Sequence, residues 1–497
     1  MEGYILGIDQ STQSTKAVLF DENGNVCAYK QIEHRQFVDE NGWVSHDMQE
    51  IYDNCIKAVK ELAACDRMYA ANIKCIAITN QRETTGMWDK ITGTPFDRAV
   101  VWQCSRAADI CEREDIKNNK EYIRKVTGLC LSPYYPAAKL AWLIENNSNI
   151  KAAKDKNNVC AGTMDSWLIF KLTKGKVFKT DISNASRSQL FDIRNEKWDE
   201  HLCDIFGVNI NMLPQVCDSD SFFGETDMEG ILSDSVPIMS VMGDSHAALF
   251  GEGCINKGMA KVTYGTGSSI MLNTGDNIVV SKSGLSSTIA WKRNGKTVYA
   301  LEGNINYTGA VITWLKDDLK LISSASDTGK LAQAAVKDDG LYLIPAFTGL
   351  GAPYWCDKAK AQIVGIDRTT GKNEIVRAAL ECIAYQISDV LLAMEKDTDC
   401  KTDNLYADGG PAQNEYLMQF QSDILQRNVD VPEMKMLSAM GTTYMAGINI
   451  GLYSEDILTD TKNMTIYSPK MNEHTCNRKY NGWKNNINRL KDCFANG

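Results

Sequence analysis

The chain of 497 residues lacks any apolar run long enough to cross a bilayer, which takes about 18 or more residues. It also lacks a basic tract, and its 53 basic and 63 acidic residues give a formal charge of −10. These features argue against a membrane span and against nucleic acid or an anionic membrane as the main partner. Because Met1-Glu2-Gly3 leads directly into a strand pattern, we expect no signal peptide and a cytoplasmic location.

Paired metal-binding cysteines are absent, although the chain has sixteen cysteines. No C-x-x-C pair occurs, and no cysteine and histidine residues have the spacing of a zinc site. Several cysteines lie inside apolar strand or helix patterns, among them Cys75, Cys254 and Cys382. We therefore expect buried free thiols in a reducing compartment.

Three familiar active-site motifs are missing as well. The G-x-x-x-x-G-K-[ST] loop and the G-x-G-x-x-G fingerprint do not occur, so any nucleotide site must use other turns. A serine hydrolase built on Gly243-Asp244-Ser245 would need a histidine base, often found in a D-x-x-H pattern near the C-terminus. No D-x-x-H occurs, which disfavours that function.

The length predicts two large domains, because a single hydrophobic core seldom serves more than about 300 residues. An apolar fraction of 44% and a charged fraction of 23% are typical of a soluble globular enzyme. We predict an N-terminal domain over residues 1–246 and a C-terminal domain over residues 247–460. The remaining residues, 461–497, are polar and rich in Asn and Lys, and we expect a surface appendage.

The most informative stretch that is present is a strand, a polar turn and a second strand near the N-terminus. The apolar run Tyr4–Ile8 ends in Asp9, hydroxyl and amide residues follow, and Lys16 opens the next run, Ala17–Phe20. Such a hairpin tip offers backbone N–H groups, hydroxyls, a cation and a carboxylate, which suits polyphosphate with Mg²⁺. The alternative is an ordinary polar hairpin. The pattern recurs at Lys261–Leu272, which suggests a duplicated ATPase core with nucleotide between the halves.

Two further turns support nucleotide binding. Gly265-Thr266-Gly267-Ser268 has glycines that let backbone amides approach an anion. Asp408-Gly409-Gly410 follows a strand and precedes a helix that begins after Asn414. Each turn alone is weak evidence, because both sequences are also common in ordinary turns.

Candidate acceptor-binding residues follow two predicted strands. Asp244 lies at a strand-to-helix turn, where it could act as a general base or simply cap the helix. Arg82 and Glu83 follow the buried strand Lys74–Thr79 and could hydrogen-bond neighbouring hydroxyls, or form a surface ion pair. Trp102 and Tyr134 could form an apolar wall for a carbohydrate, or pack in the core.

At this point seven stretches resemble the FGGY carbohydrate kinase family, from about residue 4 to about residue 450. They are I-T-N-Q-R-E-T-T (78–85), V-W-Q-C (101–104), P-Y-Y-P-A-A-K-L-A-W (133–142), N-A-S-R (184–187), G-M-A-K-V-T-Y-G-T-G (258–267), I-P-A-F-T-G-L-G-A-P-Y-W (344–355) and L-M-Q-F-Q-S-D-I-L (417–425). The resemblance is strongest to the branch that converts glycerol to glycerol 3-phosphate.

The resemblance implies an α/β fold of the actin/hexokinase type, with two ribonuclease-H-like domains that close over a cleft. It implies ATP and Mg²⁺ as cofactors, a small polyol or sugar as substrate, and we expect a homodimer. The implied nucleotide-binding residues are Thr12, Gln13, Ser14, Lys16, Thr266, Gly309, Thr313, Gly410 and Asn414, with Asp9 as the metal-associated carboxylate. The implied substrate-binding residues are Arg82, Glu83, Trp102, Tyr134, Ser245, Ser269 and Asp244, the last also being the catalytic base.

Some positions depart from the glycerol-specific pattern. Ser11, Gln13 and Thr313 stand where Gly, Thr and Gln are usual, and Ser245-His246 stands where two glutamines are usual. Ser269 replaces a phenylalanine, which would enlarge the acceptor pocket by on the order of one or two carbons. From the resemblance, phosphorylation of glycerol is the first expectation, and these departures argue for an alternative. A larger polyol or a ketose such as xylulose is the alternative, and a non-metabolic ATPase of the actin or chaperone type is less favoured.

Overall fold

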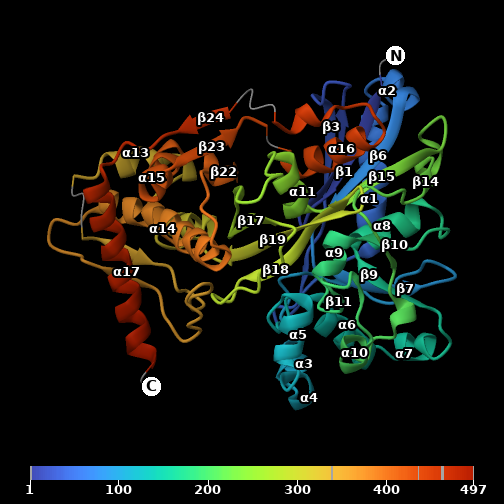
Figure 1. Ribbon diagram of the computed structural model, residues 1–497, viewed down its shortest axis with the longest axis horizontal. Helices are drawn as coiled ribbons and strands as arrows, with labels where there is room; N and C mark the ends of the chain where they lie inside the picture. The colour runs from blue at the N-terminus through green and yellow to red at the C-terminus, as the bar shows by residue number, and fades with distance from the viewer. Residues whose placement is uncertain (1–2, 337–339, 435, 460–463, 496–497) are drawn as a thin grey trace.

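The computed structural model describes residues 3–336, 340–434, 436–459 and 464–495 (Figure 1). A six-stranded sheet forms the centre of the first lobe, in the order β14-β15-β6-β1-β2-β3. Its strands are β1 (Tyr4–Gln10), β2 (Ser14–Phe20), β3 (Val26–Glu33), β6 (Ile73–Asn80), β14 (Glu225–Thr226) and β15 (Val236–Gly243). β1, β2 and β3 are antiparallel neighbours, whereas β1, β6 and β15 are parallel.

A seven-stranded sheet forms the centre of the second lobe, in the order β18-β19-β17-β16-β22-β23-β24. Its strands are β16 (Ala260–Tyr264), β17 (Ser268–Gly275), β18 (Ser286–Arg293), β19 (Lys296–Ile305), β22 (Asn404–Gly409), β23 (Asn428–Pro432) and β24 (Met464–Tyr467). Antiparallel strands again adjoin parallel ones: β18, β19, β17 and β16 are antiparallel neighbours, whereas β16, β22 and β23 are parallel. This repeated topology confirms the predicted duplication and the α/β fold class.

Helices cover both sheets. In the first lobe these are α1 (Met48–Ala63), α2 (Arg67–Asn72), α8 (Met164–Leu172) and α9 (Ile182–Ser186). In the second lobe they are α12 (Gly309–Thr313), α13 (Thr328–Gln333), α14 (Lys372–Thr398) and α15 (Glu415–Leu425), beside the hairpin of β20 (Tyr342–Ile344) and β21 (Gln362–Val364). α1 begins where the Asp47 carboxylate accepts hydrogen bonds from the backbone N–H groups of Gln49 and Glu50.

An inserted region lies at one end of the first lobe, in the lower right of Figure 1. Its five-stranded sheet has the order β4-β5-β8-β7-β9, from β4 (Phe37–Val38), β5 (Val44–His46), β8 (Ala99–Val100), β7 (Thr85–Asp89) and β9 (Val159–Thr163). The helices around it are α3 (Ala108–Glu112), α4 (Glu114–Lys117), α5 (Lys120–Thr127), α6 (Pro136–Asn146), α7 (Ser148–Lys154) and α10 (Glu200–Ile205). Short pairs complete it, β10 (Lys179–Asp181) with β13 (Gln215–Cys217) and β11 (Phe191–Asp192) with β12 (Lys197–Trp198).

The chain returns to the first lobe late in the sequence. α11 (Asp244–Gly251) packs against α16 (Leu437–Asn449), and α16 also packs on β1, β6 and β15. Figure 1 shows α16 next to these strands, of which β1 and β6 are blue and β15 is green, although all three lie more than 190 residues away in sequence. A Cβ at Gly441 would lie 1.8 Å from the carbonyl oxygen of Ala247, so only glycine permits this close helix crossing.

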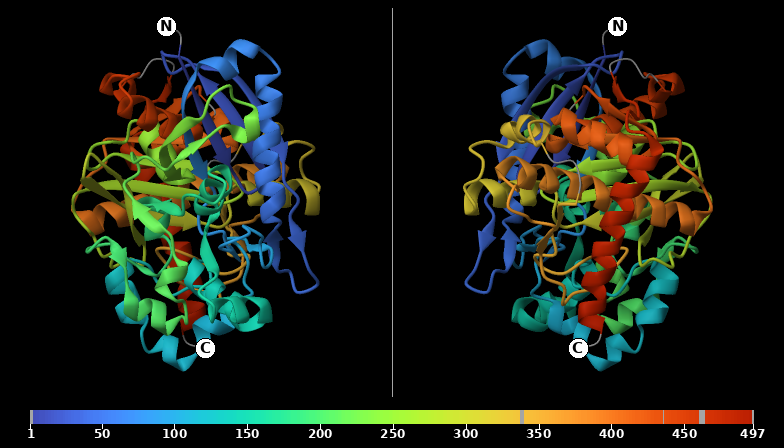
Figure 2. Two further views of the ribbon diagram at one scale, coloured as in Figure 1. Left: turned by 90° about the vertical axis from the view of Figure 1, so that its right-hand side faces the viewer. Right: turned by 90° about the vertical axis from the view of Figure 1, so that its left-hand side faces the viewer.

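The C-terminal helix α17 (Glu473–Ala495) differs from the expected surface appendage. It runs along one side of the molecule (Figure 2), yet Trp483, Ile487 and Leu490 are buried in the core of the second lobe. The Asp389 carboxylate accepts hydrogen bonds from Trp483 Nε1 at 2.7 Å and from the Tyr480 hydroxyl at 2.6 Å. Apolar residues with helical spacing therefore occur in this segment among its many Asn and Lys residues. The predicted boundary between residues 460 and 461 lies outside the described residues.

All sixteen cysteines are free, as predicted, and most are buried or half-buried. Among the helices of the described residues, none combines the length and the apolar character that crossing a bilayer requires.

Candidate functional site

Three parallel strands of the first sheet bring the acceptor-side residues together. Gln10 at the end of β1 pairs with Asn80 at the end of β6, and Gly243 at the end of β15 pairs with the same residue. The segments that continue from these carboxyl ends therefore meet at one edge of the sheet, where open α/β sheets bind ligands. These segments carry the β1–β2 hairpin, the Arg82-Glu83 pair and Asp244.

A chain of alternating charges lies at this edge. Arg82 Nε lies 3.2 Å from Asp244 Oδ1, and Arg82 Nη2 lies 2.6 Å from Glu302 Oε1. Arg187 continues the chain, with Nη1 at 2.7 Å from Glu302 Oε2 and Nε at 2.6 Å from Glu83 Oε1. All of these side chains are buried except Asp244, which is 34% exposed. The Asp244 carboxylate is thus the exposed end of this otherwise buried series of charged side chains.

Glu302 joins the two lobes. It lies on β19 of the second sheet, whereas Arg82 and Arg187 belong to the first lobe. The two guanidinium groups hold the pKa of Glu302 well below its ordinary value, although burial acts in the opposite direction. The hydroxyl of Ser269 on β17 also donates to Glu302 Oε1, at 2.8 Å. Ser269 is thereby placed beside the Arg82–Asp244 pair.

Asp244 is the first residue of α11, and Gly243 takes the N-cap position. The alternative in which Asp244 serves as the N-cap is therefore wrong, and its carboxylate instead accepts from the adjacent N–H of Ser245 at 2.6 Å and pairs with Arg82. Burial raises the pKa of Asp244, and the neighbouring Arg82 opposes that rise. A Cβ at Gly243 would lie 2.7 Å from Arg82 Cγ, so the glycine makes room for the aliphatic part of the Arg82 side chain beside the carboxylate.

The two predicted wall aromatics lie together. The Trp102 and Tyr134 rings meet edge to face, with centroids 5.8 Å apart. Trp102 Nε1 donates to the Thr12 hydroxyl at 3.0 Å, which connects this wall to the β1–β2 hairpin. Both rings are accordingly next to the hairpin tip rather than in a distant part of the core.

The β1–β2 hairpin, which is predicted to bind phosphate, has the expected form. Asp9 lies opposite Lys16 in the β1–β2 pair, and Lys16 Nζ lies 3.1 Å from Asp9 Oδ2. Gln13 is exposed at the tip, Thr12 is half-buried and Ser14 is buried. Among the described residues, no group of three or more His, Cys, Asp or Glu could hold a metal by itself. A Mg²⁺ ion at this hairpin would therefore depend on Asp9 and on phosphate oxygens, a combination that Mg²⁺ commonly accepts.

The second and third turns meet in the other lobe. The Thr266 carbonyl accepts from the N–H groups of Thr308 and Ala310, both at 3.0 Å, and Gly309 N donates to Gly265 O at 2.9 Å. Gly409 has a φ of +94°, and a Cβ there would lie 1.9 Å from Tyr264 O. The turn before Gly410 therefore packs directly against the β16–β17 hairpin.

The remaining predicted residues surround these turns. Asn414 is the N-cap of α15, and its Nδ2 donates to the Thr328 hydroxyl at 2.9 Å. Thr313 is exposed at the end of α12, and Ser245 is half-buried on α11. No contact described for Thr313 or for the Ser245 side chain ties either of them to the other site residues.

Three residues of the site lack an assigned role in the sequence reasoning: Glu302, Arg187 and Lys139. Glu302 is a lone acid within the apolar strand Lys296–Ile305, and Lys139 is a lone cation within the apolar helix Pro136–Asn146. A single charge inside an otherwise buried element is the signal that could have marked both. His246 is buried against the Thr288 hydroxyl at 3.2 Å, which agrees with a packed histidine.

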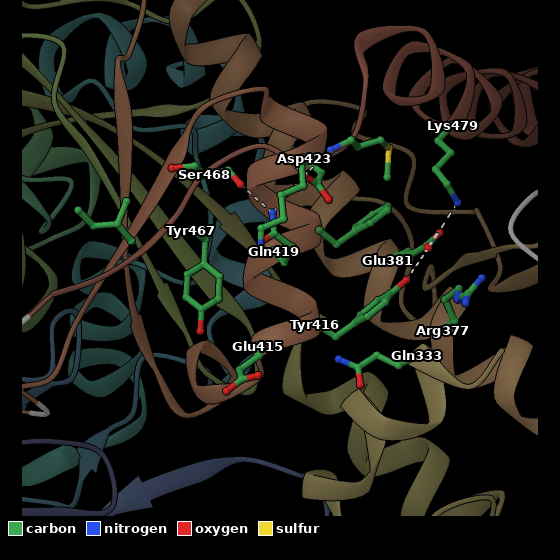
Figure 3. Close-up of a pocket in the computed structure, with 14 residues that line it drawn as sticks. Gln333, Arg377, Glu381, Glu415, Tyr416, Gln419, Asp423, Tyr467, Ser468 and Lys479 are labelled. Atoms are coloured by element: carbon green, nitrogen blue, oxygen red, sulfur yellow. Dashed lines mark hydrogen bonds and ion pairs between the residues drawn. The ribbon is translucent and has the colours of Figure 1, made fainter.

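A separate cavity of about 700 Å³ opens in the second lobe between α14, α15, β24 and α17. Glu381 lies between the Tyr416 hydroxyl, at 2.9 Å, and Lys479 Nζ, at 3.6 Å (Figure 3). None of the predicted site residues lines this cavity. The cavity lies in the second lobe, away from the residues described above.

Comparison with known proteins agrees with the geometry. Residues 4–251 match the N-terminal domain of the FGGY family of carbohydrate kinases, and residues 260–450 match its C-terminal domain. Glycerol kinase of Carboxydothermus hydrogenoformans is 44% identical over 491 residues, covering 98% of each chain.

Two solved structures have the same fold. The crystal structure of Plasmodium falciparum glycerol kinase with ADP has a TM-score of 0.93 at 35% identity, covering 98% of each chain. Xylulose kinase from Lactobacillus acidophilus has a TM-score of 0.87 at 21% identity, covering 99% of each chain, and shows the fold alone. The family matches and the full-length relatives lead to one conclusion: this chain is a member of the FGGY family of carbohydrate kinases.

Proposed function

We propose that the protein transfers the γ-phosphoryl group of ATP to a primary hydroxyl of glycerol, giving glycerol 3-phosphate and ADP. The observation that carries the proposal is the Asp244 carboxylate, the one accessible member of an otherwise buried charge chain, at 3.2 Å from Arg82. The full-length relatives named glycerol kinase support the choice of acceptor.

Asp244 is the proposed general base. Its carboxylate takes the hydroxyl proton as the acceptor oxygen bonds to the γ-phosphorus, while the bond to the β,γ-bridging oxygen breaks and ADP leaves. Arg82 and Glu83 position the acceptor hydroxyls, and Trp102 with Tyr134 contacts its C–H groups. A raised pKa suits a base that must accept this proton.

The proposed nucleotide site uses both lobes. Lys16 and the N–H groups of the two hairpins stabilise the phosphoryl oxygens, with Thr12, Gln13 and Ser14 on one side and Thr266 on the other. Gly309, Thr313, Gly410 and Asn414 are proposed to contact the rest of the nucleotide. Mg²⁺, held through Asp9 and phosphate oxygens, would neutralise charge on the phosphates.

A larger polyol or a ketose such as xylulose is the second candidate. The specific observation is Ser269, a small polar side chain that lies beside the Arg82–Asp244 pair through its bond to Glu302. A hydroxyl-bearing residue there leaves space and polarity for an additional carbon and its hydroxyl.

The experiment is an acceptor panel of C3 to C6 polyols and ketoses, read by coupled ADP release. We expect the highest kcat/KM for glycerol, and a higher value for a C4 to C6 acceptor would select the second candidate. Turnover of ATP that does not depend on any added acceptor would instead indicate an actin-like or chaperone-like ATPase.

Ser269→Phe sharpens the choice between the two candidates. If the native acceptor is larger than glycerol, the added ring should lower its kcat/KM and shift preference toward glycerol. An unchanged ranking of acceptors would show that Ser269 does not line the pocket. The proposal also includes a cytoplasmic location and a homodimer. Light scattering of the purified protein would test the homodimer.

A further inference from the structure

Lys139 is a fully buried cation beside the acceptor site. It lies in α6, is 0% exposed, and its Nζ donates to the carbonyl oxygens of Glu83 at 3.3 Å and Trp102 at 3.1 Å. The third hydrogen bond of the ammonium goes to the carbonyl oxygen of Tyr134. An ammonium has three N–H donors, and all three are used on backbone carbonyls.

The position of Lys139 is electrostatically unfavourable. It lies within the first turn and a half of α6, where the positive end of the helix dipole disfavours a cation. Within the described part of the chain, no carboxylate oxygen comes within ion-pair distance of its Nζ. Burial of a charge without an ionic partner is costly, so its presence here calls for a specific reason.

The three carbonyls belong to three residues that the proposed function places around the acceptor. Each comes from a different segment, namely the loop after β6, the loop after β8 and the turn before α6. The Glu83 backbone needs such support, because its φ of +58° is a strained conformation for a residue other than glycine. Thr84 N donates to Arg82 O at 2.7 Å, which closes a tight turn around Glu83.

We propose that Lys139 is a positioning residue that fixes these three segments in register and thereby shapes the acceptor pocket. It acts through Glu83, Trp102 and Tyr134 and does not touch the acceptor. The inference rests on the proposed phosphoryl transfer to a polyol. It adds Lys139 to the residues on which binding of the acceptor depends.

The ammonium form matters for this role, because a neutral amine keeps only two N–H donors. The charged and titratable groups that face Lys139 are Glu83, Cys104 and Arg106, with the Tyr134 ring at 5.8 Å. Burial lowers the pKa of Lys139 to about 7. As pH rises through this value, one of the three bonds is lost, and affinity for the acceptor should fall.

The test is Lys139→Met, which keeps the length of the side chain and removes the donors. We expect the KM for glycerol to rise about tenfold to a hundredfold, with the KM for ATP changed less than about threefold, since a small displacement of binding groups suffices for such losses. Lys479→Met is the matched control, because Lys479 is also buried but lies in the other lobe. It should leave the KM for glycerol unchanged.

Calorimetric titration of the wild-type protein with glycerol from pH 6 to pH 9 provides a second measurement that needs no variant. The dissociation constant should increase above about pH 7, and in Lys139→Met it should not depend on pH in this range. Three outcomes would overturn the inference. They are an unchanged KM for glycerol in folded Lys139→Met, an equal rise in the KM values for glycerol and ATP, and a wild-type dissociation constant for glycerol that does not change with pH. If wild-type protein phosphorylates no polyol or ketose, the proposed function itself fails.

Discussion

The two sides of the site are built from different parts of the chain. On the acceptor side, charged side chains from both lobes form a buried network, in which Glu302 contacts Arg82 and Arg187 at 2.6 and 2.7 Å. On the proposed nucleotide side, many contacts are between backbone groups at turns, such as Gly309 N with Gly265 O at 2.9 Å, and the Lys16–Asp9 pair is a charged side-chain contact there. In the proposed function, the charged side chains select the acceptor, whereas backbone N–H groups at the turns suit any nucleoside triphosphate.

This difference predicts which property of the enzyme a substitution on each side of the site should change. A changed side chain on the acceptor side alters charge, and so it should change chemistry, acceptor affinity and pH dependence. A change at a glycine of the nucleotide-side turns acts through backbone space, and so it should alter nucleotide affinity while the acceptor side stays intact. Variants on each side therefore test whether the two sides are separable.

The largest effect is expected for Asp244→Asn, which removes the proposed base from the acceptor side. We expect kcat to fall by about two to four orders of magnitude, roughly the contribution of general base catalysis. Binding of ATP, measured by calorimetry, should be retained. Asp199→Asn is the control, since Asp199 caps α10 outside the site through Leu202 N at 2.8 Å. Near-normal turnover of Asp244→Asn would refute the role.

A smaller effect is expected for Arg82→Gln. We expect kcat/KM for the acceptor to fall about ten- to a hundredfold, because Glu302 is buried and loses one of its two cationic partners. The guanidinium also opposes the burial that raises the pKa of Asp244, so its removal should raise that pKa further. The base must be deprotonated, and activity is lost as pH falls through its pKa.

The acidic limb of the profile of kcat/KM against pH should therefore move to higher pH in Arg82→Gln. A limb that stays in place would mean that Arg82 and Asp244 do not interact in the working enzyme.

The smallest of the three effects is expected for Gly409→Ala on the nucleotide side. The new Cβ would lie 1.9 Å from Tyr264 O, so the backbone of one turn must move. We expect the KM for ATP to rise about tenfold, consistent with about 1–2 kcal/mol of strain, and the KM for the acceptor to stay within twofold. Gly451→Ala is the control for backbone strain without a steric clash. Gly451 also has a positive φ, +74°, but a Cβ there would meet no atom within 4 Å. A larger change in acceptor affinity than in ATP affinity would contradict the separation.

Much of this site could be predicted from sequence because its parts are local. The hairpin at Asp9–Lys16, the turn at Gly265–Ser268 and the strand-to-helix turn at Asp244 are each contained within a few residues. Their backbone form follows from short-range turn chemistry, and the structure places them at the ends of strands as expected.

The role of α17 could not be predicted in the same way. Its polar composition indicated an exposed segment, yet the stripe formed by Trp483, Ile487 and Leu490 is buried against α14 and its neighbours. Whether a stripe is buried depends on a partner surface that is distant in sequence, and here Asp389 supplies the hydrogen-bond acceptors.

The sequence by itself determined the fold class, the duplicated strand–turn–strand units and the family, because these depend on local patterns and on motifs of many residues. The tertiary structure alone decided that Glu302 links the lobes, that Arg187 connects it to Glu83, and that Lys139 holds three separate loops. Apart from the contact of Lys139 with Tyr134, five positions away, these contacts join residues that are 37 to 220 positions apart. No short-range rule specifies such pairs, since they form only when two sheets and an inserted helix are packed together.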